Sequence, residues 1–150
     1  MKLKIPPALV AVFIAGMMWL LNYLLPVGNL YLPGTRLVAV TLFVIGGIIG
    51  VISLYQFFKI KTTINPHNPE KTSQLVVNGL YNVSRNPMYL ALFILLVAYA
   101  TVLHNIFNLL ILPIFVWYMN RFQIIPEEQA LSEKFGEDFE EYRSQVRRWL

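Results

Sequence analysis

The sequence predicts an all-α integral membrane protein with about four transmembrane helices, followed by short amphipathic helices in a C-terminal cytosolic tail. Hydrophobic residues make up 57% of the 150 residues and charged residues only 13%, whereas roughly a quarter of the residues in a soluble domain are charged. The apolar residues also lie in four long blocks, three of which contain no charged side chain. A chain of this length is expected to form one domain over residues 1–150.

The first apolar block covers residues 7–25 and follows Lys2 and Lys4. Each of the four blocks approaches or exceeds the ~20 residues needed to cross a bilayer core of ~30 Å. Backbone groups in lipid must form their hydrogen bonds within the segment, so a helix is expected. No pattern of small residues near Pro26 resembles a cleavage site, which favours a retained helix over a removed signal peptide.

The remaining blocks cover residues 37–58, 88–103 and 106–125. Gly46 and Gly50 in the second block form a step of small residues that lets another helix approach closely. Packing within the chain is favoured over a dimer contact. The last two blocks are joined by so short a turn that they should form an antiparallel hairpin, in which Pro113 is expected to kink the second helix.

The chain changes character after Pro126, in the tail formed by residues 126–150. Apolar residues recur there every three to four positions among many acidic ones, a pattern typical of amphipathic helices with a break near Gly136. Proline suits a first helical turn, and the acidic pair Glu127 and Glu128 suits the positive end of the helix dipole.

Lysine and arginine predict the orientation in the membrane. They gather at the N-terminus, in the loop after the second block and in the tail, whereas the first loop has only Arg36 and the turn near His104 has none. The loop residues that carry this signal are Lys59, Lys61, Lys71 and Arg85. Both termini are therefore expected in the cytoplasm, and the compact chain favours a prokaryotic inner (plasma) membrane.

Two polar segments are candidates for a functional site: residues 74–89, which lead into the third block, and residues 121–128, which leave the fourth. Because the two helices form a hairpin, both segments should meet at the cytoplasmic membrane edge. Their carboxylates, tyrosines and amides suit a cationic, nucleoside-like ligand. Taken singly, the same side chains also fit lipid phosphate contacts, a helix cap or interfacial aromatic residues.

Other classes of site find little support. The chain has no cysteine, no phosphate-binding loop and no GxGxxG stretch. His67 and His104 should lie on opposite membrane faces, so no metal site is expected. No basic cluster interleaved with aromatics indicates nucleic acid as a partner. The second and third blocks lack charges that would line an ion path, which weakens a transporter hypothesis.

The two polar segments resemble the superfamily of isoprenylcysteine carboxyl methyltransferases and phospholipid N-methyltransferases. The family's first motif reads approximately LVxxGxYxxxRHPxY, and its second is a Glu-Glu pair after the last membrane helix. The residues that match these two motifs here are Leu75, Val76, Gly79, Tyr81, Arg85, Asn86, Pro87, Tyr89, Glu127 and Glu128.

The resemblance implies S-adenosyl-L-methionine as the methyl donor and a lipophilic small molecule or a lipid as the acceptor, with membrane lipids as surroundings. It implies that the donor is bound by Leu75, Val76, Tyr81, Arg85, Asn86, Pro87, Tyr89 and Glu127. Gln123, Arg121 and Glu128 are the candidate catalytic residues, Glu128 as a general base if the acceptor is an amine or a hydroxyl.

Two positions depart from the family pattern. Asn86 stands where the family has His, and Gln123 stands where the isoprenylcysteine enzymes have Arg. A neutral amide does not replace a bidentate guanidinium at a carboxylate, which argues against a prenylcysteine carboxylate as acceptor. The alternative hypothesis is a non-catalytic membrane scaffold or lipid-binding protein that retains the fold.

Overall fold

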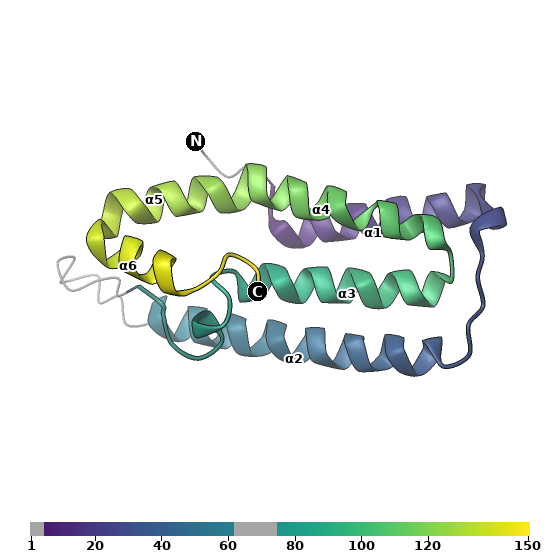
Figure 1. The fold of residues 1–150 in the computed structure, drawn as a ribbon, viewed down its shortest axis with the longest axis horizontal. Coiled ribbons are helices and arrows are strands. Elements are labelled where there is room, and N and C mark those ends of the chain that lie inside the picture. Colours follow the sequence, from purple (N-terminus) through teal and green to yellow (C-terminus); the bar gives the residue numbers. More distant parts are fainter. Residues whose placement is uncertain (1–4, 62–74) are drawn as a thin grey trace.

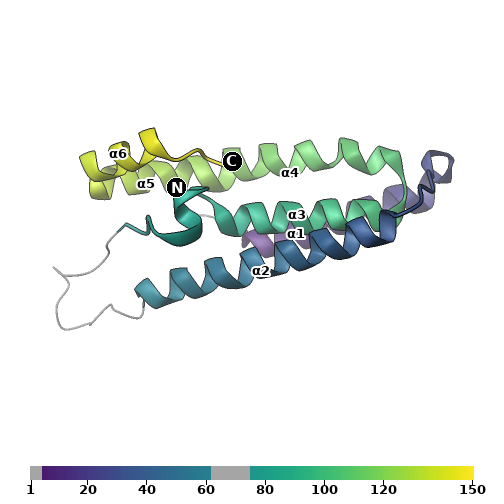
Figure 2. The same cartoon turned by 60° about the horizontal axis from the view of Figure 1, so that its bottom comes forward.

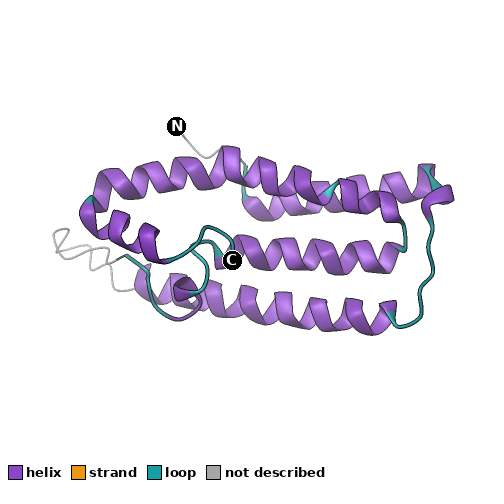
Figure 3. Ribbon diagram, in the orientation of Figure 1, coloured by secondary structure: helices purple, strands orange, loops and turns teal. Residues whose placement is uncertain are grey.

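The computed structural model describes residues 5–61 and 75–150, which contain helices and no β-strand (Figure 3). The α-helices are α1 (Pro7–Leu24), α2 (Thr35–Lys61), α3 (Pro87–Leu103), α4 (Leu112–Met119), α5 (Ile125–Phe135) and α6 (Glu137–Gln145). Short 3-10 helices cover Pro26–Gly28, Gly79–Asn82 and Ile106–Leu110, and a π-helical turn covers Asn120–Ile124. The four expected apolar helices are therefore present, with ends a few residues from those predicted.

Helix lengths and lipid-facing surfaces agree with an integral membrane protein. Among the described residues, Pro7–Leu24, Thr35–Phe57 and the helical run Ile106–Phe135, which joins a 3-10 helix to α4, the π-helical turn and α5, are long and apolar enough to cross a bilayer, and α3 is a shorter apolar helix. Large apolar side chains cover the outer faces of α1 and α2, where Val12 and Leu37 are 69% and 72% exposed. Soluble monomers rarely expose such continuous apolar surface, so lipid must solvate it.

The third helix occupies the centre of the bundle (Figure 1). It contacts α2 on one side and both α1 and α4 on the other. The main core lies between α1, α3 and α4, where Ile14, Met18, Leu96 and Phe115 are buried together. Figure 2 shows α4 and α5 as one nearly continuous rod that extends beyond the start of α3.

Small residues form the contact between α2 and α3. A Cβ atom at Gly46 would lie 3.1 Å from the side chain of Leu95, and one at Gly50 would lie 3.6 Å from Ala91 Cβ. Gly47, by contrast, has no atom within 4 Å of such a Cβ. The step of small residues therefore serves packing within the chain, as predicted.

At the end of the bundle away from α5 and α6, the first loop is tied to the turn between α3 and α4. The Leu30 N–H donates to the His104 carbonyl at 2.6 Å, and Asn105 Nδ2 donates to the Leu25 carbonyl at 2.8 Å.

Pro113 lies in the first turn of α4, so the prediction of a kink there is wrong. The proline begins a helix, where its missing N–H costs little.

The helix that begins at α4 continues through the π-helical turn into α5, and Pro126 lies in the first turn of α5, as predicted. A π-helical turn precedes the proline, and the Ile125 N–H donates to the Asn120 carbonyl five residues earlier. This wider turn relieves the clash that proline causes inside an α-helix. The predicted break at Gly136 is present, with a φ of 54° that favours glycine.

The start of α1, the end of α2, the start of α3 and the helices α5 and α6 all lie toward one end of the molecule (Figure 1). Successive apolar helices therefore run in alternating directions, which is the arrangement that the lysine and arginine pattern predicts. Lys2, Lys4, His67, Lys71 and Gln74, which also entered the sequence analysis, lie outside the described residues.

Candidate functional site

A pocket of about 390 Å³ lies where the two polar segments meet, at the α5 and α6 end of the bundle. This volume is within the range of ligand pockets, roughly 300–1,000 Å³. All residues predicted to bind the cofactor line it: Leu75, Val76, Tyr81, Arg85, Asn86, Pro87, Tyr89 and Glu127. The convergence expected from the hairpin topology is thus observed.

The first polar segment is shaped by a glycine turn and a proline. Gly79 has a φ of 66°, a backbone conformation that favours glycine, and a Cβ there would displace the end of the Gln56 side chain. The 3-10 helix that follows places Tyr81 in the interior, where its carbonyl accepts a 2.7 Å hydrogen bond from Tyr142 Oη. Pro87 then begins α3, so the chain enters the membrane helix directly from the pocket wall.

A hydrogen bond between Tyr89 and Glu127 joins the two segments. Tyr89 Oη donates to Glu127 Oε1 at 2.7 Å, from the first turn of α3 to the first turn of α5. Glu127 has no salt bridge with a described residue, so its second oxygen remains available for a ligand. Burial, with a contribution from the Glu127 charge, raises the pKa of Tyr81 to about 12, so this hydroxyl stays neutral.

Glu128 has a different environment from its neighbour, although both line the pocket. It is 8% exposed and contacts two guanidinium groups: Arg85 Nη2 at 2.9 Å and Arg148 Nη2 at 2.6 Å. Arg148 Nε adds a third hydrogen bond at 3.1 Å. These bonds occupy the carboxylate, so Glu128 fastens the surrounding segments together.

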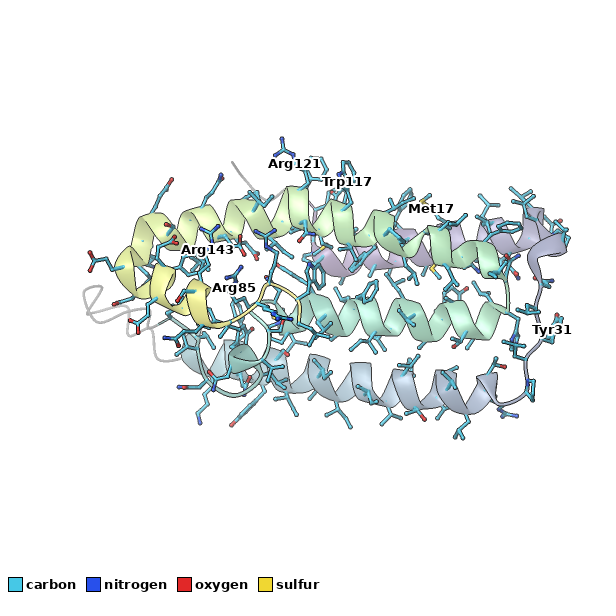
Figure 4. All side chains as sticks on the ribbon, viewed as in Figure 1. Met17, Tyr31, Arg85, Trp117, Arg121 and Arg143 are labelled. Atoms are coloured by element: carbon cyan, nitrogen blue, oxygen red, sulfur yellow. The ribbon has the colours of Figure 1, made fainter. Side chains whose placement is uncertain are left out.

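The C-terminal segment runs back across the start of α3. The Arg85 N–H donates to the Arg147 carbonyl at 3.0 Å, and Arg85 Nη1 donates to the Arg143 carbonyl at 2.8 Å. Figure 4 shows Arg85 and Arg143 close together below α5. Asn86 Nδ2 likewise donates to the Arg148 carbonyl at 3.0 Å. The backbone of the C-terminal segment therefore helps to fix the pocket wall.

Trp149 anchors the end of this segment to the bundle. Its Nε1 donates to Asn120 Oδ1 at 3.0 Å, and its ring lies 6.3 Å from that of Phe93, centroid to centroid. In the sequence, Arg148 and Trp149 belong to a basic and aromatic end that is typical of an interfacial anchor, and only the fold brings them to Glu128 and Asn120.

Gln123 and Arg121, two of the candidate catalytic residues, do not line the pocket. Gln123 is 2% exposed, and its Nε2 donates to the carbonyl of Ile5 at the start of the described chain. Arg121 points away from the bundle beside Trp117 (Figure 4). Among the described residues, neither side chain has a hydrogen bond to Glu127 or Tyr89.

The pocket also includes residues that the sequence analysis did not select, among them Met88, Leu131, Lys134 and Phe139. Leu131 and Lys134 follow Glu127 by four and seven positions, so the helical period of α5 places them on one face. Among the described residues, no group of three or more His, Asp or Glu side chains could hold a metal ion.

The fold and the pocket define a class: α-helical proteins that cross the membrane several times and carry a ligand-sized pocket at one membrane edge. Within that class, the chain belongs to the phospholipid methyltransferase family, whose model matches residues 35–138. The match includes Tyr89 and Glu127 but ends before Tyr142 and Arg148.

Two relatives match shorter stretches. An uncharacterized protein of Haemophilus influenzae is 43% identical over 63 residues, which cover 42% of this chain and all of that protein. The protein-S-isoprenylcysteine O-methyltransferase of Schizosaccharomyces pombe is 32% identical over 76 residues, which cover 51% of this chain and 32% of the yeast protein. No solved structure matches the chain.

Proposed function

We propose that this protein transfers a methyl group from S-adenosyl-L-methionine to a lipophilic or lipid-like acceptor at the cytoplasmic face of the membrane. One observation carries the proposal: the Tyr89–Glu127 pair lines a pocket at the membrane edge of a chain that belongs to the phospholipid methyltransferase family.

The chemistry of the pocket fits such a donor. Leu75, Val76 and Pro87 offer apolar surface for an adenine ring, and the rings of Tyr81 and Tyr89 offer faces that attract a sulfonium. The free oxygen of Glu127 can accept hydrogen bonds from ribose hydroxyls. This set of groups is complementary to a nucleoside that carries a positive charge.

When bound, S-adenosylmethionine supplies a methyl carbon that an acceptor atom attacks, so that a bond to this carbon forms as the sulfur–carbon bond breaks. The chain's own residues bind and orient the two reactants and exclude water, because displacement of this kind depends mainly on in-line positioning. Tyr89 holds Glu127 in place, and Glu128 holds Arg85. Because Glu128 already accepts three hydrogen bonds, we assign it a structural role in place of the general-base role considered from the sequence.

The acceptor is proposed to come from the membrane. The pocket lies beside the first turn of α3, at the edge of a bundle whose outer faces are apolar. A lipophilic molecule could therefore reach the pocket without leaving the bilayer. With Gln123 buried and bonded to the Ile5 carbonyl, no free guanidinium stands at that position to select an acceptor carboxylate.

Calorimetric titration of the detergent-solubilised protein with S-adenosylhomocysteine tests the donor site. We expect binding by the wild type, and a loss of about 10- to 100-fold in affinity for Glu127→Ala, as for a lost hydrogen bond to a charged group. Glu133→Ala is the matched control, because Glu133 is an exposed acidic residue of the same helix outside the pocket. Absence of binding by folded wild-type protein would refute the proposal and favour the scaffold hypothesis.

We also propose that both ends of the chain face the cytoplasm of a prokaryotic inner membrane. Reporter fusions at Leu32, in the first loop, and after Leu150 test this orientation. A cytoplasmic signal is expected only from the fusion after Leu150, and a cytoplasmic signal at Leu32 would overturn it.

A further inference from the structure

The charged residues that line the pocket fall into two groups. Arg85 and Glu128 bond to each other and, through Glu128, to Arg148. Glu127 and Lys134 belong to no such network. Lys134 has no hydrogen bond or ion pair with a described residue, and its Nζ lies 5.6 Å from the ring centroid of Phe135. Among the residues that the structure describes, the pocket therefore presents one available carboxylate and one available ammonium group.

These two groups lie on the same face of α5 but at different depths. Glu127 is in the first turn and partly buried, whereas Lys134 is in the last turn and exposed at the rim. Seven residues separate them, a rise of about 10.5 Å along the helix axis. Leu131 lies between them and also lines the pocket. A ligand along this face would meet a carboxylate, then apolar surface, then a cation.

We infer that Lys134 binds the carboxylate at the amino-acid end of the methyl donor, while Glu127 contacts its nucleoside end. The inference rests on the proposed function and deepens it by giving the donor a direction in the pocket. A carboxylate that enters a largely apolar pocket needs a cation, and Arg85 is already engaged by Glu128. The rim also suits the most strongly hydrated end of the ligand, since Lys134 is exposed there.

A lysine in the last turn of a helix also interacts favourably with the helix dipole, and that role would be independent of any ligand. The two roles predict different results. Stabilisation of α5 alone would change the binding of every ligand of the pocket equally. A contact to the donor's carboxylate changes the binding only of ligands that carry this group.

The test is a comparison of two ligands by calorimetry. One is S-adenosylhomocysteine, and the other is its decarboxylated analogue, which keeps the ammonium group and lacks only the carboxylate. For Lys134→Ala we expect S-adenosylhomocysteine affinity to fall about threefold to fivefold, as for an exposed ion pair, and the affinity for the analogue to stay unchanged. Lys134→Arg should keep the wild-type affinity for both, and the loss should shrink at high salt.

Arg36→Ala is the control, since Arg36 is an exposed cation in the first turn of α2, at the opposite end of the molecule. Equal affinities of wild type and Lys134→Ala for S-adenosylhomocysteine would overturn the inference. An equal loss for both ligands would overturn it as well and would indicate a structural role. If the folded wild type bound neither ligand, the proposed function itself would fail.

Discussion

Replacement of Glu128 by Gln tests the ion-pair network that fastens the C-terminal segment to the start of α3. The substitution preserves the shape of the side chain and removes its charge. In the wild type, this carboxylate accepts one hydrogen bond from Arg85 and two from Arg148. In the variant, both guanidinium groups keep their charge and lose their only carboxylate partner among the described residues.

The magnitude follows from how deeply each partner is buried. The side chains of Arg85 and Glu128 are both 10% exposed, whereas that of Arg148 is 32% exposed and is therefore better solvated. Breaking a buried pair by removing one partner costs about 3–5 kcal/mol. Arg85 still donates to the Arg143 carbonyl. We therefore expect the lower end of that range, a decrease of about 3 kcal/mol in the free energy of unfolding.

Unfolding of the detergent-solubilised protein, followed by tryptophan fluorescence, measures this change. Glu140→Gln is the matched control, because Glu140 pairs with Arg143 at 3.5 Å and the two side chains are 50% and 48% exposed. Exposed pairs contribute about 1 kcal/mol or less. If the two variants lost the same stability, the network around Glu128 would not have the energetic role argued from its burial.

Three further predictions concern other contacts. Tyr89→Phe removes the hydrogen bond to Glu127, so affinity for S-adenosylhomocysteine should fall about tenfold in calorimetry while the fold is kept; unchanged affinity would contradict the role of the pair. Gly46→Leu should destabilise the protein by about 1–3 kcal/mol through overpacking against Leu95, whereas Gly47→Leu should not, and similar unfolding midpoints would refute the packing argument. Trp149→Phe should lower stability by about 0.5–1.5 kcal/mol through loss of the Asn120 hydrogen bond, and a neutral result in the same unfolding assay would count against that anchor.

Much of this architecture could be predicted from the sequence, because bilayer thickness and backbone hydrogen bonding leave few choices to long apolar segments. The hairpin formed by α3 and α4 then required residues 74–89 and 121–128 to meet at one edge. The pairing of Tyr89 with Glu127 agrees with that expectation. Which ligand the pocket takes stays a prediction.

Other features depend on contacts that local sequence does not reveal. Pro126 normally indicates a helix boundary, and its place inside a continuous helix depends on the π-helical turn before it. Asn120 and Gln123 in that turn bond to Trp149 and Ile5, residues far away in the chain. Arg148 resembles any basic residue of an interfacial tail until the fold brings it to Glu128. Long-range partners of this kind are set by the fold as a whole.

The π-helical turn Asn120–Ile124 sets the rotation of α5 about the helix axis relative to α4. Deletion of one residue there would leave the sequences of α1, α2 and α3 unchanged. It would rotate α5 about its axis by about 100° and draw it about 1.5 Å toward the membrane. Glu127, Leu131 and Lys134 would then all leave the pocket together, although none of them had been changed. The direction in which α5 presents its side chains is thus encoded by the number of residues in this turn as well as by their identity.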